Sequence, residues 1–160
     1  MGGSAAGGDF LSTICDLKGS IPVIVQRDYV IPAWWDEQWL VIATSHSGNT
    51  EEAIEATEIA LKSGATVIVI STGGILSGLA ELHYNCYLIP SIGGQPPRSA
   101  FGHIFARQLA LFRCLGIMPS DNDDQAMLTR LQSVVEEYDF ISIEVSQMKR
   151  MNVIDREANE

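Results

Sequence analysis

Hydroxyl and amide side chains that could bind an anion gather in one short stretch, Ser45-His46-Ser47-Gly48-Asn49-Thr50. An apolar run at residues 39–43, typical of a buried strand, comes directly before it. Residues 50–62 follow, with apolar side chains at helical spacing. The stretch is therefore expected to form the turn between a strand and a helix.

Such a turn could hold a phosphate group. The first N–H groups of a helix lack partners within the helix and lie at the positive end of its dipole. Hydroxyls supply further donors, and a glycine lets the backbone come close to a ligand. The simpler interpretation is that Asn49 or Thr50 caps the helix, with Glu51 and Glu52 complementing its dipole. A cap needs one side-chain oxygen, whereas four compete in this turn, so phosphate binding is favoured.

A second candidate ligand, Arg98, stands in the segment 93–100, which contains two glycines and two prolines before the arginine. The prolines restrict the backbone, so the arginine is expected at the start of a helix. A cation there opposes the helix dipole, which suggests that it points at an anion. A surface ion pair with one of the 20 acidic residues is the alternative.

The composition restricts the class of protein. The chain has 160 residues, of which 46% are hydrophobic and 19% charged, as in a globular domain of ordinary size. A net charge of −10 argues against a broad nucleic-acid or anionic-membrane surface. It leaves a small phosphorylated ligand possible, because the field of one turn can outweigh distant charges. No apolar run is long enough for a membrane span, so we expect a cytoplasmic protein that binds neither nucleic acid nor membrane.

The cysteines and histidines predict no metal centre. Cys15, Cys86 and Cys114 are far apart and lack paired spacing, so buried, reduced thiols are expected. The three histidines show no metal-ligand spacing. We therefore expect neither a metal nor another cofactor.

Strands and helices are expected to alternate along the chain. Continuous apolar runs at residues 21–25, 39–43, 66–70 and 86–90 are typical of strands that are buried on both faces. Helices are expected at residues 50–62, 76–82 and 99–115, the first of them ended by Gly64. This order predicts an α/β fold with a mostly parallel sheet flanked by helices. Ligands in such sheets bind beyond the carboxyl ends of the strands, where the serine-rich turn falls.

Both ends of the chain are unusual. Residues 1–9 are rich in glycine and are expected to form a loop of the kind that leaves a strand, yet no strand comes before them. At the other end, residues 123–137 have helical spacing, and the charged residues 148–160 follow without a stop signal. The fold is therefore expected to be truncated at both ends, with a binding domain at residues 1–118 and a helix and linker at residues 119–160.

Three segments together resemble the sugar isomerase (SIS) domain, and more narrowly the bifunctional phosphoglucose/phosphomannose isomerase family. Residues 1–9 look like the glycine-serine loop of that family, residues 45–52 like its serine-rich phosphate turn, and residues 96–100 like its Pro-Pro-Arg segment. The resemblance covers about residues 1–115 and implies a flavodoxin-like three-layer sandwich. The activity that it implies is interconversion of glucose 6-phosphate or mannose 6-phosphate with fructose 6-phosphate.

The resemblance also implies roles for single residues. The side chains of Ser45, Ser47 and Thr50 should hold the phosphate, with backbone help around Gly48. The sugar side of the pocket should be lined by Gly3 and Ser4. A homodimer is implied as well.

The same resemblance gives Arg98 the role of stabilising the negative charge of an enediolate intermediate, which arises as a proton moves between adjacent carbons. Family members carry two tandem SIS domains, and the glutamate base lies in the second, which this chain does not contain. No base is therefore assigned to Glu51, Glu52 or His103. The expected function is the phosphate-binding half of the isomerase. The alternatives are a non-catalytic sugar-phosphate-binding module, or a single-SIS isomerase of pentulose or hexulose phosphates.

Overall fold

The computed structural model describes residues 2–29, 31–96, 99–119 and 125–138. The chain divides into two compact units, Met1–Pro119 and Ser120–Glu160. In the second unit, residues 125–138 are described and are helical, in agreement with the helix expected at residues 123–137. The first unit contains all the other helices and strands described below.

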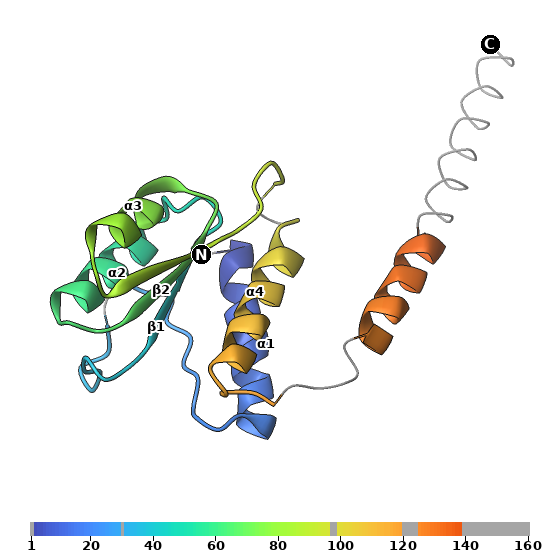
Figure 1. Ribbon diagram of the computed structural model, residues 1–160, viewed down its shortest axis with the longest axis horizontal. Helices are drawn as coiled ribbons and strands as arrows, with labels where there is room; N and C mark the ends of the chain where they lie inside the picture. The colour runs from blue at the N-terminus through green and yellow to red at the C-terminus, as the bar shows by residue number, and fades with distance from the viewer. Residues whose placement is uncertain (1, 30, 97–98, 120–124, 139–160) are drawn as a thin grey trace, which may run out of the picture. The chain divides into compact units, whose positions relative to one another are not determined.

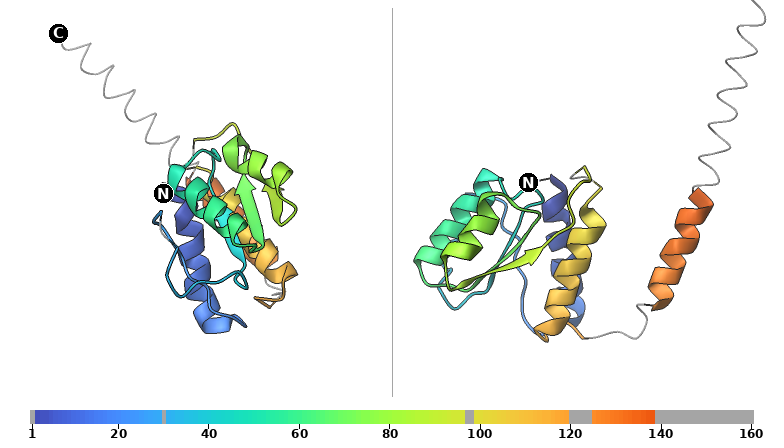
Figure 2. Two further views of the ribbon diagram at one scale, coloured as in Figure 1. Left: turned by 90° about the vertical axis from the view of Figure 1, so that its left-hand side faces the viewer. Right: turned by 45° about the horizontal axis from the view of Figure 1, so that its top comes forward.

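A parallel sheet of three strands forms the centre of the first unit, in the order β1-β2-β3. Its strands are β1 (Val41–Thr44), β2 (Val67–Ser71) and β3 (Cys86–Pro90). Helices α2 (Glu51–Lys62) and α3 (Gly74–Leu82) cover one face, and α1 (Gly2–Lys18) and α4 (Phe101–Cys114) cover the other (Figures 1 and 2). The expected α/β fold with helices on both faces of a parallel sheet is confirmed.

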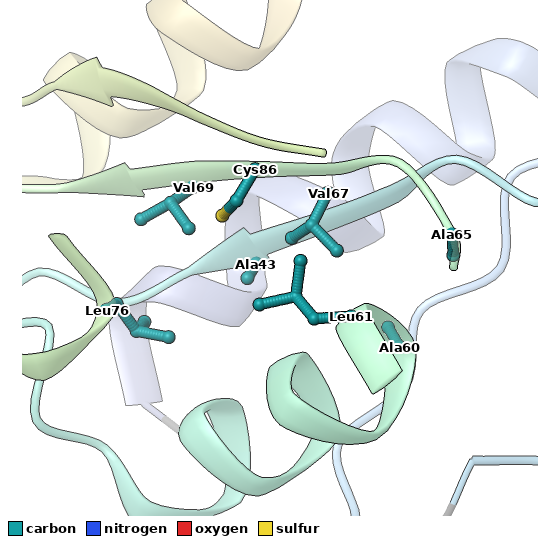
Figure 3. Packing of buried hydrophobic residues seen from close by; sticks show 8 residues of the cluster. All are labelled: Ala43, Ala60, Leu61, Ala65, Val67, Val69, Leu76 and Cys86. Atoms are coloured by element: carbon teal, nitrogen blue, oxygen red, sulfur yellow. The ribbon is translucent and has the colours of Figure 1, made fainter. Parts of the chain in front are cut away.

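The core between the sheet and α2 and α3 is built from small and branched side chains. Alternate residues of β2, Val67 and Val69, point to this face and are fully buried. Leu61 of α2 reaches toward them beside Ala43, as Figure 3 shows. Leu76, which is 0% exposed, is the buried residue of α3. This alternation arises because successive side chains of a strand point to opposite faces.

A second core lies on the opposite face of the sheet. Leu11 and Cys15 of α1 pack with Phe112 of α4, and Ile42 of β1 contacts this cluster. Gly7 lies against α4: a Cβ atom there would be 2.4 Å from Gln108 Oε1 and 3.7 Å from the Cα atom of Phe105. A side chain at this position would therefore displace the Gln108 side chain from its present place.

Gly64 ends α2 as expected from the sequence. Its φ of +93° is left-handed, a conformation that glycine adopts without strain. The N–H of Gly64 donates to Leu61 O at 3.1 Å, and the N–H of Ala65 donates to Ala60 O at 3.1 Å. This pair of bonds is the Schellman arrangement, which satisfies carbonyls at the helix end and turns the chain into β2.

Two expectations about the beginning of the chain are wrong. Residues 2–9 belong to helix α1 and are not a loop; among their glycines, Gly7 lies against α4 and Gly8 against Val25. Residues 21–25 are not a strand: they form no regular element, and no described strand pairs with them. Ser12 Oγ donates to Val23 O at 2.7 Å, which ties this segment to α1 instead.

The cysteines are free, as expected, but only two of them are buried. Burial raises the pKa of the Cys15 and Cys86 thiols above the ordinary 9.0, and for Cys15 the negative charge of Asp16 adds to the effect. Cys114 is exposed near the end of α4, which corrects the expectation of three buried thiols. No helix in the described part of the chain is long and apolar enough to cross a membrane.

Candidate functional site

The serine-rich turn lies at the carboxyl end of β1 and leads into α2. Ser45 is 1% exposed, and its N–H donates to Ile70 O of β2 at 3.1 Å. Its hydroxyl lies 2.7 Å from Thr50 Oγ1 and accepts the N–H of Gly48 at 3.1 Å. Ser45 therefore closes the turn from the inside and fixes the position of Thr50.

Two glycines interlock this turn with the next strand-to-helix turn, between β2 and α3. Gly48 has a φ of +71°, and a Cβ atom there would be 1.8 Å from Gly73 O. Gly74 has a φ of +72°, and a Cβ atom there would be 2.4 Å from Ser47 O. Only glycine fits at these two positions, because both the backbone conformation and the space exclude a side chain.

The outer side of the turn carries polar groups that a ligand can reach. Ser47 and Asn49 are exposed, and the N–H of Asn49 donates to Ser47 Oγ at 3.2 Å. Thr50 is the N-cap residue of α2, but its side chain makes no capping bond to the first turn. The N–H groups at the start of α2 are thus not capped by Thr50, as an anion site at a helix start requires.

The start of α1 also reaches this turn. The N–H of His46 donates to Ser4 Oγ at 3.2 Å, which joins residues separated by 42 positions in the sequence. Gly3 lies beside Ser4 in the same first turns of α1. The structure thus brings two of the segments named in the sequence together, Gly3 and Ser4 with the turn that contains Ser45, Ser47, Gly48 and Thr50.

His46 also connects the turn to the loop after β3. Its Nε2 atom lies 3.1 Å from Gln95 O, while its carbonyl accepts the N–H of Thr72 at 3.1 Å and the Thr72 hydroxyl at 2.7 Å. The loop that carries the predicted arginine therefore contacts the site at Gln95. Arg98 itself lies outside the described residues, and helix α4 begins at Phe101.

Gln108 is a polar residue beside the site that the sequence reasoning missed. It is 4% exposed, its Nε2 atom donates to Thr44 Oγ1 at 3.0 Å, and its Oε1 atom has no hydrogen-bond partner. Its spacing of four residues from Ile104 and from Phe112 could have indicated burial, because it places all three on the buried face of α4. The Gly73-Gly74 pair was missed too, although it follows an apolar strand in the same way as Gly48 follows β1.

Among the residues that the structure describes, no three His, Cys, Asp or Glu side chains lie close enough together to hold a metal ion. The groups that the site offers a ligand are hydroxyls, amides and backbone N–H groups. These suit an oxyanion, and the acidic Glu51 and Glu52 in the first turn of α2 suit the helix dipole.

Comparison with known proteins identifies relatives over most of the chain. It is 44% identical over 140 residues to a bifunctional phosphoglucose/phosphomannose isomerase from Caldicellulosiruptor bescii, which covers 86% of this chain and 41% of the relative. Proteins of the same name from Thermoplasma volcanium and Aquifex aeolicus are 43% and 31% identical, over 65% and 78% of this chain and 32% and 38% of their own length. No model of a known protein family matches the chain.

The chain spans less than half the length of the relatives that it matches. The similarity to the C. bescii protein covers 86% of this chain, which leaves out too few residues at either end to miss the serine-rich turn or the strands of the sheet, all within residues 41–90. These similarities support assignment of the chain to the bifunctional phosphoglucose/phosphomannose isomerase family.

Proposed function

We propose that this chain binds a phosphorylated sugar at the turn between β1 and α2 and supplies the phosphate-binding part of an aldose–ketose isomerase. The substrates would be glucose 6-phosphate, mannose 6-phosphate and fructose 6-phosphate. The observation that carries the proposal is the turn itself, where hydroxyls and uncapped backbone groups converge at the carboxyl end of a parallel strand. The names of the relatives support the same substrates.

The proposed roles of the turn residues follow from their surroundings. Ser47 is exposed and donates its hydroxyl to the phosphate, together with Thr50 and the N–H groups at the start of α2. Gly48 lets the backbone come close to the ligand, and Ser45 holds Thr50 in position from below. Gly3 and Ser4 line the sugar side, which is supported by the hydrogen bond between Ser4 and His46.

Isomerisation needs a base that moves a proton between adjacent carbons, and we assign none within this chain. By resemblance, Arg98 stabilises the negative charge of the enediolate, and the base comes from outside residues 1–160. The proposed contribution of the chain is therefore binding and orientation of the substrate, which brings the reacting carbons to groups elsewhere in the whole enzyme.

Two further proposals concern the assembled protein. A homodimer is supported by an aromatic cluster in which Phe10, 58% exposed, packs against the half-buried Phe101 and Phe105. A cytoplasmic location is supported by three cysteines that are all free.

Thermal unfolding of the 160-residue chain with and without fructose 6-phosphate tests the binding proposal. Ligand at about a hundred times its dissociation constant adds roughly 2.7 kcal/mol to the free energy of unfolding. The midpoint should then rise by about 5–10 °C for a domain of this size. A cooperative transition that does not move with the ligand contradicts the proposal.

The Ser47→Ala variant shows whether the turn is responsible. Loss of a hydrogen bond to a charged group costs about 1.5–3 kcal/mol, so binding should weaken at least about tenfold. The unliganded midpoint should fall only slightly, because the one bond lost there, from the Asn49 N–H to Ser47 Oγ, is exposed to water. Ser133→Ala, which removes an exposed serine hydroxyl from the helix at residues 125–138, is the matched control and should bind normally. The chain can also be mixed with the part of a relative that it does not match. Sugar-phosphate binding without isomerisation in that mixture would favour the alternative of a non-catalytic binding module.

A further inference from the structure

Helix α3 begins beside the serine-rich turn, and the turn supplies partners for its first N–H groups. The N–H of Ile75 donates to Asn49 Oδ1 at 3.1 Å, and the N–H of Leu76 donates to Gly48 O at 3.0 Å. Gly73, the N-cap residue of α3, makes no side-chain capping bond of its own. Asn49 therefore does for α3 what an N-cap asparagine does for its own helix, but from a segment 26 positions earlier in the sequence.

The starts of α2 and α3 differ in what they offer a ligand. In α2 the side chain of Thr50 makes no capping bond to the first turn. In α3 the N–H groups of Ile75 and Leu76 are already bonded to the serine-rich turn. An anion is therefore directed to the start of α2, and the start of α3 holds the turn in place.

The bond from Leu76 fixes the orientation of the peptide group between Gly48 and Asn49. In a planar trans peptide the C=O and N–H groups point in opposite directions, so the Asn49 N–H points away from α3. It donates to Ser47 Oγ at 3.2 Å. Because this bond occupies a lone pair of the hydroxyl oxygen, the hydroxyl hydrogen of Ser47 stays free to point at a ligand.

The donors in this series all point in one direction, from α3 toward the exposed Ser47. The N–H of Leu76 donates to the peptide that follows Gly48, the N–H of that peptide donates to Ser47 Oγ, and the Ser47 hydroxyl is the last donor. Hydrogen bonds in such a chain polarise one another. The positive end of the α3 dipole lies at the beginning of the chain, so α3 strengthens the donor that an anion meets at Ser47.

We propose that Asn49 is a positioning residue of the phosphate site and acts through α3. Its side-chain oxygen holds the start of α3 against the turn, so that the N–H of Leu76 orients the peptide before Asn49 and, through it, the Ser47 hydroxyl toward the phosphate. Gly74 makes room for this contact, because a Cβ atom there would be 2.6 Å from Asn49 Oδ1. The inference rests on the proposed function, since it concerns the same site.

Titration of 15N-labelled variants with fructose 6-phosphate, followed by NMR, tests this inference. Asn49→Ala removes the acceptor of the Ile75 N–H, so this N–H should exchange faster with solvent. Binding should weaken on the order of tenfold, the effect of one lost hydrogen bond to a charged group. Asn49→Asp combined with Glu51→Gln keeps both the side-chain oxygen and the charge of the turn but lacks the Asn49 amide N–H groups. This charge-balanced variant should restore slow exchange at Ile75 and bind nearly as well as the unaltered chain.

Leu79→Ala is the matched control, because Leu79 packs against the core from α3 but takes part in neither bond to the turn. It should lower the stability and leave the affinity unchanged. Unchanged affinity in Asn49→Ala, or equal weakening in Leu79→Ala, overturns the inference. So does weak binding by the charge-balanced variant, which would mean that the Asn49 amide contacts the ligand directly. If the unaltered chain does not bind fructose 6-phosphate, the proposed function fails and this inference fails with it.

Discussion

Ser45 and Ser47 are two positions apart in one turn but have opposite surroundings. The Ser45 hydroxyl is buried and is bonded to Thr50 and to the backbone of Gly48, whereas Ser47 is exposed. From the sequence, hydroxyls were seen to be concentrated here, and both serines were predicted to hold the phosphate. Which hydroxyl turns inward depends on the conformation of the turn and on its contact with β2, which the residue types do not reveal.

Gly48 should be the least replaceable residue of this turn. A Gly48→Ala change introduces both an unfavourable backbone conformation and a contact of 1.8 Å with Gly73 O. The strain alone costs about 1–2 kcal/mol, and the clash with backbone adds to this, so the urea midpoint of unfolding should fall markedly. Gly64→Ala is the matched control, because it has a similar positive φ of +93° but nothing within 4 Å of the added atom. Equal losses in the two variants would contradict the interlocked turn.

The buried thiols predict a loss of stability in alkaline solution. In the unfolded chain Cys15 and Cys86 ionise near the ordinary pKa of 9.0, whereas burial raises the pKa of each thiol in the folded protein. The folded state therefore keeps protons that the unfolded state loses, and the free energy of unfolding falls as pH rises above 9.0. The slope is at most about 1.4 kcal/mol per pH unit for each thiol.

Urea unfolding between about pH 8 and 10.5 measures this dependence. Cys86→Ala should reduce the slope above the thiol pKa even if it also lowers the stability at neutral pH. Ionisation of Tyr29 also lowers the free energy of unfolding, but at higher pH, because the negative charge of Glu52 raises the pKa of its phenol above 10.0. The measurements are therefore repeated in the Tyr29→Phe background. An unchanged slope in Cys86→Ala would contradict the account.

At the scale of the elements, the long periodic segments could be predicted and the start of the chain could not. Residues 50–62 were expected as a helix and form α2 from Glu51 to Lys62, and Gly64 ends it in the expected conformation. Residues 66–70 and 86–90 were expected as strands and form β2 and β3 within one residue at each end. These segments carry their own apolar spacing and their own stop signals.

The two errors arose because neighbouring elements decide the structure there. Glycine is a poor helix former, so residues 2–9 were expected as a loop, but in the structure Gly7 lies in a helix against the Gln108 side chain of α4. Residues 21–25 have a strand composition, but a strand needs a hydrogen-bonded neighbour, and no described strand is paired with them. The composition of a segment reveals neither which helix will pack against it nor whether a strand will pair with it.

Leu76 is the fully buried side chain of helix α3, with the partly buried Leu79 and Ala80 packed against the same core. Leu76 is 0% exposed and contacts the core over β2, whereas Leu82 on the same helix is 80% exposed. Leu76→Ala should lower the free energy of unfolding by about 2–5 kcal/mol, and Leu82→Ala should change it by less than about 0.5 kcal/mol. Similar effects in the two variants, measured by urea unfolding, would contradict the packing of α3 described above.

At the scale of the whole molecule, the acidic balance and the candidate site need to be reconciled. The net charge is −10, and a sugar phosphate is also an anion. The local groups outweigh the distant charges because exposed charges more than about 10 Å away are largely screened at physiological salt. The hydroxyls and N–H groups of the turn act within hydrogen-bond distance, so the position of the turn matters more than the total charge.

The site is also the place where distant parts of the first unit meet. Ser4 of α1, the turn after β1, Thr72 after β2 and Gln95 after β3 are joined around His46 by hydrogen bonds. The expectation that ligands bind beyond the carboxyl ends of parallel strands predicted this location. The role of His46 as their common contact could not be predicted, because it depends on three segments far apart in the sequence.

A titration of the 15N-labelled chain with fructose 6-phosphate, followed by NMR, tests the central claim most directly. We expect the largest shifts at the backbone N–H groups of Gly48 to Glu52 and at Ser4, and none with fructose that lacks the phosphate. Shifts confined to another part of the chain, or equal shifts with both sugars, would contradict a phosphate site at the turn between β1 and α2.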